Sequence, residues 1–260
     1  MTETNKTLYI PLYGKALVSR MGIILSDRKA EEIWEKESFP LGRKSKSKWL
    51  AYYMAMRARV FDDAATKAIE NNPDAVVLHI GCGMDSRYLR LGKNVQWFDI
   101  DFPAVVEEKK KYFAENDYYH LFAGDATEIE KWINSFTDKT AIVIMEGVSM
   151  YLTKQQMQNV VAVLHSHFDK TVLIADFYSE FAAKASKYKN PVNEVGATIH
   201  SGMDSPMEMV VNENIRFVQE LDMTPTALIS QLTGAEQKIF NIIYAGKFAK
   251  GLYRMFEYEL

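Results

Sequence analysis

Three acidic residues and one glycine turn each lie at the end of a short apolar run, and together they could bind a nucleoside. The turn that begins at Gly81 has the pattern Gly-x-Gly, where glycine permits positive φ and lets a ligand approach the backbone closely. Asp101 lies twenty positions further on, the spacing at which a carboxylate accepts hydrogen bonds from a ribose diol. Asp125 and Glu146 stand at the ends of the next two runs. Three such acids after a Gly-x-Gly turn predict a nucleoside pocket.

Two aspartates share the second of these runs, and they need not have the same role. Asp99 and Asp101 lie on one face of a strand by its period of two, so one could bind the ligand while the other supports it. Asp101 also precedes Pro103, so the competing interpretation is that it caps a helix that starts there. We expect ligand binding at Asp101.

The scaffold that positions these residues is predicted by five apolar runs that alternate with helix-like segments. Such alternation is typical of βαβ units and of a doubly wound α/β domain with a mainly parallel sheet. Ligands bind outside the carboxyl ends of the strands in such sheets, so the acidic residues should share one edge. The runs are "AVVLHI" (75–80), "VQWFDI" (95–100), "YYHLFA" (118–123), "AIVIME" (141–146) and "TVLIAD" (171–176).

The 260 residues are interpreted as one domain with four segments. Residues 1–74 read as a helical cap, with one long helix from Trp49 to Ile69, and residues 75–176 form the cofactor-binding core. Helices are expected over 105–116 and over 154–168, the second with a T-x-x-Q capping box. Residues 177–214 are expected to form a lid insertion after the fifth strand, and 215–260 two final strands around a helix.

Composition excludes several classes of partner. A formal net charge of -3 gives no reason to expect nucleic acid or an anionic membrane surface. The start "MTETNKTLYIPLYG" lacks the pattern of a signal peptide, and the single cysteine, Cys82, fits a reducing cytoplasm. His165 and His167 alternate on a predicted helix and face apart, so we expect no metal site there.

The type of cofactor follows from what the glycine turn lacks. A dinucleotide fingerprint has a third glycine, but Ser86 stands at that position. The chain contains neither a Tyr-x-x-x-Lys pair nor a P-loop. A compact cationic cofactor without phosphates, S-adenosylmethionine, suits an edge rich in carboxylates better. An NAD(P)-dependent oxidoreductase and a non-catalytic cofactor-binding module remain the alternatives.

Several segments also resemble the successive motifs of the leucine carboxyl methyltransferase family. They are "HIGCGMDSRYLRL", "WFDIDFP", "GDA" and "IMEGVSMYL", and upstream "MRARVFDD" resembles an Arg-x-Arg-x-Phe-Asp segment of the family's bacterial branch, the tetracenomycin-type polyketide O-methyltransferases. The resemblance covers about residues 57 to 152. It implies a class I methyltransferase fold with a Rossmann-like sheet of seven strands, the last antiparallel, and S-adenosylmethionine as cofactor.

The resemblance also implies roles for individual residues around the cofactor. Gly81 would lie against the cofactor, and Asp101 would hold the ribose hydroxyls. Asp125 and Ala126 would flank the adenine. Glu146 would lie near the methionine end.

Basic residues in the helical cap are matched to the cofactor carboxylate in the same way. Arg57 corresponds to the family's arginine with that role, although Arg59 is close enough in sequence to compete. Lys15, in "PLYGKALVSR", would be a lysine with the same role. Cys82 stands where the family often has alanine, a replacement between two small residues.

The expected activity is O-methyl transfer to a hydroxyl or carboxylate of a small, polyketide-like molecule or to a carboxyl terminus. A carboxylate acceptor needs no general base, whereas a phenol or alcohol benefits from one. No residue is assigned to that role, and Tyr151, Tyr178 and His200 are candidates by position alone. Tyr52, Tyr53, Met54 and Met56 are interpreted as helix packing rather than as a substrate site.

Overall fold

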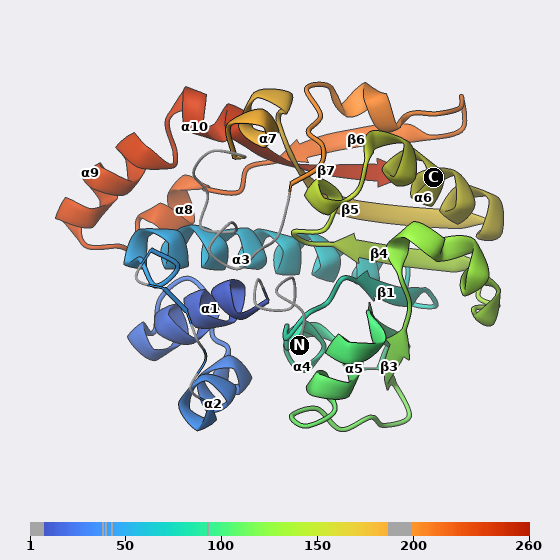
Figure 1. Ribbon diagram of the computed structural model, residues 1–260, viewed down its shortest axis with the longest axis horizontal. Helices are drawn as coiled ribbons and strands as arrows, with labels where there is room; N and C mark the ends of the chain where they lie inside the picture. The colour runs from blue at the N-terminus through green and yellow to red at the C-terminus, as the bar shows by residue number, and fades with distance from the viewer. Residues whose placement is uncertain (1–7, 38, 40, 43, 93, 187–198) are drawn as a thin grey trace.

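A seven-stranded sheet forms the centre of the molecule. The computed structural model describes residues 8–37, 39, 41–42, 44–92, 94–186 and 199–260. The strands lie in the order β3-β2-β1-β4-β5-β7-β6; the first five are parallel, and β7 runs antiparallel to β5 and β6 (Figure 1). This confirms the predicted doubly wound α/β fold and its antiparallel last strand. The strands are β1 Val76–Ile80, β2 Trp97–Asp101, β3 Tyr119–Ala123, β4 Thr140–Met145, β5 Lys170–Tyr178, β6 Arg216–Leu221 and β7 Tyr253–Glu259.

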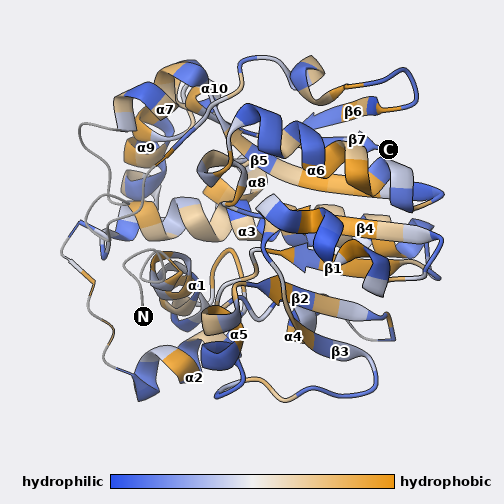
Figure 2. Ribbon diagram, turned by 45° about the vertical axis from the view of Figure 1, so that its right-hand side comes forward, coloured by the Kyte–Doolittle hydropathy of each residue, from blue (hydrophilic) through white to orange (hydrophobic). Residues whose placement is uncertain are grey.

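The central strands are mostly apolar because both faces of the sheet are covered. All five residues of β1 are buried, with Val77 in one hydrophobic core and Val76 and Leu78 in the other. Helix α3 contributes Phe61 to the first core, and α6 contributes Leu164 to the second. Figure 2 shows the apolar strands between these layers. A parallel sheet buried on both faces accounts for the continuous apolar runs in the sequence.

The helices cover the two faces and one end of this sheet. In Figures 1 and 2, α1 and α2 lie on one side of α3 and α9 on the other, beyond the carboxyl ends of the parallel strands. The α-helices are α1 Tyr9–Met21, α2 Arg28–Lys36, α3 Lys48–Asn71, α4 Arg87–Leu91, α5 Pro103–Lys109, α6 Lys154–His167, α7 Glu180–Ser186, α8 Thr226–Ile229, α9 Gly234–Ile243 and α10 Lys247–Leu252. The 3-10 helices are η2 Ala126–Lys131, η3 Ile133–Ser135, η4 Ser149–Tyr151 and η6 Pro206–Met209.

Local sequence signals correctly predicted one helix start and one helix end. Helix α6 starts with the predicted capping box, in which Thr153 and Gln156 each bond the other's backbone N–H. Helix α3 ends at Asn71, directly before the Asn72-Pro73 pair, as a proline shortly after the C-cap favours. No helix in the described part of the chain has both the length and the apolar character needed to cross a bilayer.

Two predicted helical regions differ from the structure. The helix expected over 105–116 is the shorter α5, and Asn116 instead accepts the N–H groups of Tyr118 and Tyr119 in a turn that leads into β3. The single helix expected between the last two strands is three helices, α8, α9 and α10. Thr233 starts a new capping box at α9, and Gly246 is the N-cap of α10, so the chain restarts a helix at each point.

The segment predicted as a lid lies only partly in the described residues. It begins inside β5, which extends to Tyr178, and continues through α7 and η6. Residues 187–198 of the predicted lid lie outside the described residues. The backbone N–H of His200 donates to the carbonyl of Met150 at 2.8 Å, so this part of the segment contacts the region after β4. The lid role itself stays a prediction.

Candidate active site

One cavity of about 930 Å³ lies at the carboxyl ends of the parallel strands. Its lining comes from the loops after β1, β2, β3 and β4, from the N-terminal helices α1 and α3, and from the end of the chain around α9, α10 and β7. Every residue that the sequence assigned to the cofactor lines this cavity. These residues are Lys15, Arg57, Gly81, Asp101, Asp125, Ala126 and Glu146.

The glycine turn after β1 has a backbone that other residues rarely adopt. Gly81 has φ of 69° and Gly83 has φ of 51°, both in the left-handed region. A Cβ atom on Gly81 would lie 2.3 Å from Cγ2 of Val148, in the loop after β4. The N–H of Gly81 donates to the carbonyl of Ile100 at 2.7 Å, which ties the turn to β2. Glycine is therefore needed at this position for both conformation and space.

Asp101 holds the same turn from the neighbouring strand. Its Oδ2 accepts the N–H of Gly83 at 2.8 Å, and its Oδ1 accepts the N–H of Phe102 at 2.7 Å. The N-cap of α5 is Phe102, with no side-chain cap, so the capping interpretation of Asp101 is wrong. Burial raises the pKa of the Asp101 carboxyl. A carboxylate has about four acceptor positions, so the two not used by the backbone fit the hydroxyls of a ribose.

Asp99, on the same strand, is buried beneath this loop. It accepts hydrogen bonds from the Trp97 indole at 2.9 Å and the Tyr119 hydroxyl at 2.7 Å, and pairs with the Lys109 ammonium at 2.7 Å. Lys109 also donates to the backbone carbonyl of Asp85, in the glycine turn, at 2.7 Å. Asp99 thus supports the turn while Asp101 lines the cavity, the division of roles that the sequence left open.

Asp125 is partly engaged as a helix cap. Its Oδ1 accepts both the N–H and the hydroxyl of Thr127 at 2.8 Å, at the start of η2. Its backbone carbonyl accepts the Trp132 indole N–H at 2.9 Å. Asp125 and Ala126 therefore form a fixed corner of the cavity, and among the described residues the Oδ2 atom of Asp125 has no hydrogen-bond donor, so it can accept from a ligand.

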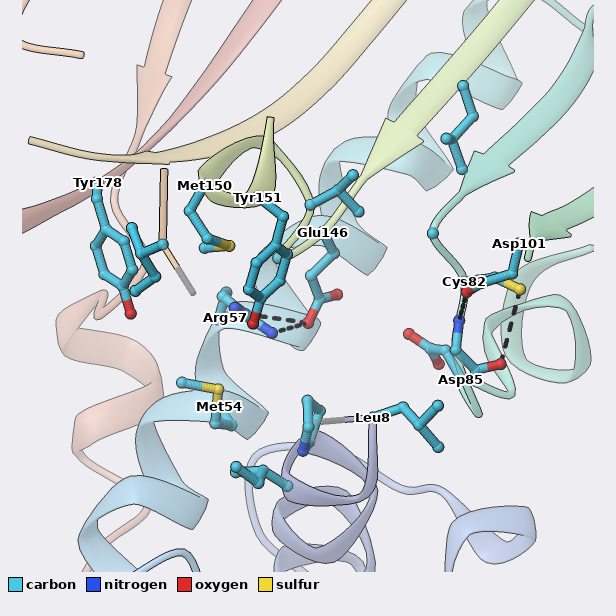
Figure 3. A pocket seen from close by; sticks show the side chains of 18 of the residues that line it. Leu8, Met54, Arg57, Cys82, Asp85, Asp101, Glu146, Met150, Tyr151 and Tyr178 are labelled. Carbon is cyan, nitrogen blue, oxygen red and sulfur yellow. Dashed lines mark hydrogen bonds and ion pairs between the residues drawn. The ribbon is translucent and has the colours of Figure 1, made fainter. Parts of the chain in front are cut away.

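Arg57 faces the cavity from α3 and is paired with Glu146. The Nη2 to Oε1 distance is 2.8 Å, and both side chains are only 5% exposed (Figure 3). Arg59, the competing arginine, pairs instead with Asp63 at 2.8 Å on the outside of α3, where its side chain is 42% exposed. Of the two arginines, Arg57 is the one that lines the cavity.

Glu146 is surrounded by a buried network of ion pairs. The sequence analysis did not predict this network. Arg87 contacts Glu146 and pairs with Asp62 at 2.7 Å and with Asp85 at 3.3 Å. Lys15 pairs with Asp85 at 2.9 Å. Burial alone would raise the pKa of Glu146, but Arg57 and Arg87 lower it to about 2. Further members are Arg90, Asp27 and Asp176.

A signal for this network was present in the sequence. Asp62 interrupts the apolar face of α3 between Phe61 and Ala65, all three of them buried. A charged residue on a buried helix face predicts an ionic partner, because an unpaired buried charge is costly. The sequence contains no signal that identifies Arg87, on another helix, as that partner.

The charge of the cavity separates the two cofactor classes. Its described lining carries two cations, Lys15 and Arg57, and the four carboxylates of Asp85, Asp101, Asp125 and Glu146. Asp85 lies directly after the glycine turn, where a dinucleotide would place its anionic pyrophosphate. S-adenosylmethionine carries a sulfonium, an ammonium and one carboxylate, so its net positive charge fits an acid-rich lining. The residues present thus fit this cofactor and disfavour NAD(P).

The other end of the cavity is apolar and aromatic. Tyr53 stacks on Tyr244 with ring centroids 5.0 Å apart, and Tyr178 lies 4.4 Å from Tyr253. Met54 also lines the cavity. Tyr53 packs against the first hydrophobic core, as expected, but it and Met54 border the cavity as well, which the packing interpretation did not include. The adjacent Tyr52 and Met56 are buried in the core, as expected. Tyr53 and Met54 lie on the side of α3 that faces the cavity, whereas Tyr52 and Met56 lie on the side that faces the core.

The three residues considered as bases also lie here. Tyr151 projects from η4, after β4, and Tyr178 from the last position of β5 (Figure 3), and His200 is an exposed residue of the lining. Among the described residues, no group of three or more His, Cys, Asp or Glu side chains is placed to hold a metal ion.

Comparison with known proteins identifies the family. The model of the leucine carboxyl methyltransferase family matches residues 2–165. This chain belongs to the leucine carboxyl methyltransferase family. It is therefore an S-adenosylmethionine-dependent methyltransferase of the class I fold, and O-methyl transfer, expected from the sequence, is the activity for which this family is named.

Individual relatives agree with that assignment. The chain is 26% identical to the tetracenomycin polyketide synthesis O-methyltransferase TcmP of Streptomyces glaucescens, over 91% of this chain and 89% of the relative. It is 25% identical to the S-adenosyl-L-methionine-dependent methyltransferase dpfgK of Gibberella zeae, over 80% and 78% of the two chains. The solved structure of the Synechocystis magnesium protoporphyrin IX methyltransferase with bound SAH has a TM-score of 0.51 at 11% identity, covering 88% and 93%. That structure supports the fold.

Proposed function

We propose that this methyltransferase transfers a methyl group to an oxygen atom of a small, largely apolar acceptor, either a hydroxyl or a carboxylate. The observation that carries the proposal is a single cavity that joins an acidic edge at the strand ends to a tyrosine-lined apolar end. A pocket of about 930 Å³ has the size of a binding site for a cofactor and a small molecule together.

In this proposal the acidic edge binds the adenosyl part of the cofactor. The free acceptor positions of Asp101 hold the ribose hydroxyls, and Asp125 with Ala126 borders the adenine. Gly81 leaves room beside the backbone for the methionine part. The negative lining attracts the net positive charge of the cofactor.

The methionine end is held by the buried ion pairs. Arg57 and Lys15 offer cations to the cofactor carboxylate, and Glu146 offers an acceptor to its ammonium group. Each of these side chains is already held by a buried partner, so little rotamer freedom is lost on binding. When bound, S-adenosylmethionine supplies an electrophilic methyl group on a sulfonium centre.

The apolar end positions the acceptor and excludes water. Methyl transfer is an in-line displacement, which depends chiefly on alignment of the reacting atoms in a closed site. The aromatic rings of Tyr53, Tyr178, Tyr244 and Tyr253 offer flat surfaces to a planar molecule. The relative from Streptomyces glaucescens is named for tetracenomycin polyketide synthesis, which supports a polyketide-like acceptor over a protein carboxyl terminus. A cytoplasmic location remains our inference from the one free, buried cysteine, Cys82.

A transfer assay tests the proposal. The protein is incubated with methyl-labelled S-adenosylmethionine and a panel of phenols and aromatic carboxylates, and labelled ethers and esters are detected by mass spectrometry. We expect label in at least one aromatic acceptor and none with the Asp101→Ala variant. Binding of S-adenosylhomocysteine without transfer to any acceptor, including those in a cell extract, would support the non-catalytic module instead.

A further inference from the structure

Asp176 is a fully buried carboxyl group to which neither the family motifs nor the proposed function gives a role. It lies near the carboxyl end of β5, and its exposed fraction is 0%. Its Oδ1 accepts the N–H of Gly147 at 2.8 Å, and its Oδ2 accepts the hydroxyl of Tyr253 at 2.6 Å. Gly147 has φ of 71°, so the loop after β4 adopts a left-handed turn to make this contact.

Tyr253 connects this buried group to the cavity. It starts β7 and lines the cavity next to Tyr178, while its hydroxyl donates to Asp176. The same oxygen accepts a hydrogen bond from Nη1 of Arg57 at 2.8 Å. A tyrosine hydroxyl has one proton and two acceptor lone pairs. One lone pair of the Tyr253 oxygen therefore remains for a hydroxyl group of a ligand.

We propose that Tyr253 and Asp176 form a proton relay that takes the proton of a hydroxyl acceptor during methyl transfer. This inference rests on the proposed function and adds the general base that the sequence did not reveal. Tyr253 is the group that touches the acceptor, and Asp176 acts through it. The relay serves a phenol or alcohol and is idle with a carboxylate, which has no proton to lose.

The atoms of the step balance within the site. The acceptor oxygen forms a bond to the methyl carbon as the methyl–sulfur bond breaks, and that electron pair stays on sulfur. The acceptor proton moves to Oη of Tyr253, and the proton of Tyr253 moves to Oδ2 of Asp176. The products are the methyl ether, the neutral thioether of the cofactor and a protonated Asp176.

The surroundings of Asp176 suit this role. Burial raises the pKa of Asp176 to about 6, although Arg57 acts to lower it. The other charged or titratable groups that face it are Glu146 from the loop after β4, Tyr53 from α3, and Tyr178 and Tyr253 from β5 and β7. At pH 7 and above Asp176 is ionised and accepts a proton more readily than an ordinary aspartate. Burial also raises the pKa of Tyr253, so its oxygen passes a proton on and does not stay ionised.

A purely structural role makes a different prediction. If Tyr253 only held Arg57 in place, its loss would weaken cofactor binding and slow all acceptors equally. If it passes protons, its loss slows only acceptors that have a proton to lose. The two cases are separated by comparing phenols with benzoates under saturating cofactor.

The first experiment uses Tyr253→Phe, which keeps the ring beside Tyr178 and removes only the hydroxyl. We expect kcat with phenols to fall about 100- to 10,000-fold, the usual contribution of general base catalysis. The lost hydrogen bond to Arg57 weakens the cofactor site and slows both classes of acceptor alike, so the readout is the ratio of kcat with phenols to kcat with benzoates under saturating cofactor, which should fall about tenfold or more. The matched control is Tyr258→Phe, on the same strand, whose hydroxyl donates to the carbonyl of Pro206 at 3.0 Å away from the cavity.

The outcomes separate the relay from the proposed function. Equal losses with phenols and benzoates, or turnover of benzoates alone by the wild type, overturn the relay and leave O-methyl transfer standing. A wild-type protein that methylates neither class overturns the proposed function and the relay together. A larger defect of the variant with phenols at about pH 7 than at about pH 10 adds support, because Asp176 is ionised at both values and ionised phenols need no base.

A second readout does not depend on turnover. Infrared difference spectra of the protein with bound S-adenosylhomocysteine report protonated carboxyl groups directly. We expect a carboxyl band that disappears with a midpoint near pH 6 and is missing from Asp176→Asn. A band of Asp176 that persists in the wild-type protein at pH 8 overturns the relay, because the carboxyl group would then already hold a proton and could not accept one.

Discussion

The two ends of the cofactor cavity are built in different ways. At the adenosyl end, Asp101 and Asp125 are held by backbone N–H groups from nearby turns. At the methionine end, Arg57 and Glu146 are held by other buried charges, from helices and strands far apart in the chain. Backbone-held carboxylates keep acceptor positions free for a ligand. Mutually paired charges satisfy one another and depend on one another.

This difference predicts a division between binding and stability. Removing one partner of a buried ion pair leaves the other charge buried without compensation, which is strongly destabilising. Removing a carboxylate that is held by turns at the cavity wall leaves only backbone N–H groups without a partner. Substitutions at the methionine end should therefore lower the free energy of unfolding, and those at the adenosyl end should chiefly lower cofactor affinity.

The largest effect is expected for Glu146→Gln. The change removes the carboxylate that Arg57 and Arg87 share, so that Arg57 keeps Asp176 at 3.4 Å and Arg87 keeps Asp62 and Asp85. Because buried positive charge is then less compensated, we expect a loss of about 3–5 kcal/mol in the free energy of unfolding. Urea unfolding at pH 7 measures it. The control is Glu128→Gln, which breaks an exposed pair with Lys131 and should change little. Equal small effects of both variants would remove the distinction between the two ends.

The next effect is the pH dependence that Asp176 contributes. Its pKa is raised from an ordinary 3.8 to about 6 in the folded state, so the native protein binds this proton more tightly than the unfolded chain. The contribution to stability is thus greatest below about pH 4 and is lost as pH rises to about 6, by about 3 kcal/mol in total. Urea unfolding of wild type and Asp176→Asn at pH 4, 5, 6 and 7 should show the variant gaining stability relative to wild type as pH rises. A difference that does not change with pH is the contrary result.

A smaller effect on stability, with a large effect on binding, is expected for Gly81→Ala. Alanine at positive φ costs about 1–2 kcal/mol, and the new methyl group also meets Cγ2 of Val148. Gly22→Ala is the matched control, because Gly22 has φ of 67° but nothing within 4 Å of its would-be Cβ. Calorimetric titration with S-adenosylhomocysteine should show binding lost only in Gly81→Ala. Retained affinity in that variant would mean that the turn does not border the cofactor.

The smallest effect on stability is expected for Asp101→Asn. The free energy of unfolding should change by less than about 1 kcal/mol, while the loss of charge-assisted bonds to the ribose weakens S-adenosylhomocysteine by about 10- to 100-fold. Asp125→Asn is the comparison: asparagine keeps the cap on η2, so we expect a smaller loss of affinity. A stability loss at Asp101 as large as that at Glu146 would contradict the division between the two ends.

The same division explains what could be predicted from the sequence. The fold and the adenosyl end follow from local order, because Gly81, Asp101 and Asp125 each end a strand and parallel strands end at one edge. The methionine end depends on partners such as Asp62 with Arg87 and Asp176 with Tyr253, 25 and 77 positions apart. No local pattern pairs such residues. Arg57 and Glu146 were assigned through family resemblance, not through their mutual contact.

Helix boundaries could likewise be predicted only where a local sequence signal marks them. The capping box at Thr153 was sufficient to place α6, whereas the three short helices between β6 and β7 were merged into one. The apolar residues of that region, such as Phe240, pack against the first core, and the tertiary contact fixes where each helix ends. The sequence also could not show which side of α3 faces the cavity. Tyr52 and Tyr53 are the same residue type, and only the structure shows that Tyr53 points toward the cavity and Tyr52 into the core.

The central claim is that this cavity selects a cationic adenosyl cofactor over an anionic dinucleotide. Isothermal titration of the wild-type protein with S-adenosylmethionine, S-adenosylhomocysteine and NADH tests it most directly. We expect one molecule of either sulfur compound to bind per chain and NADH to give no binding heat. The account would be contradicted if the folded protein bound NADH but bound neither S-adenosylmethionine nor S-adenosylhomocysteine.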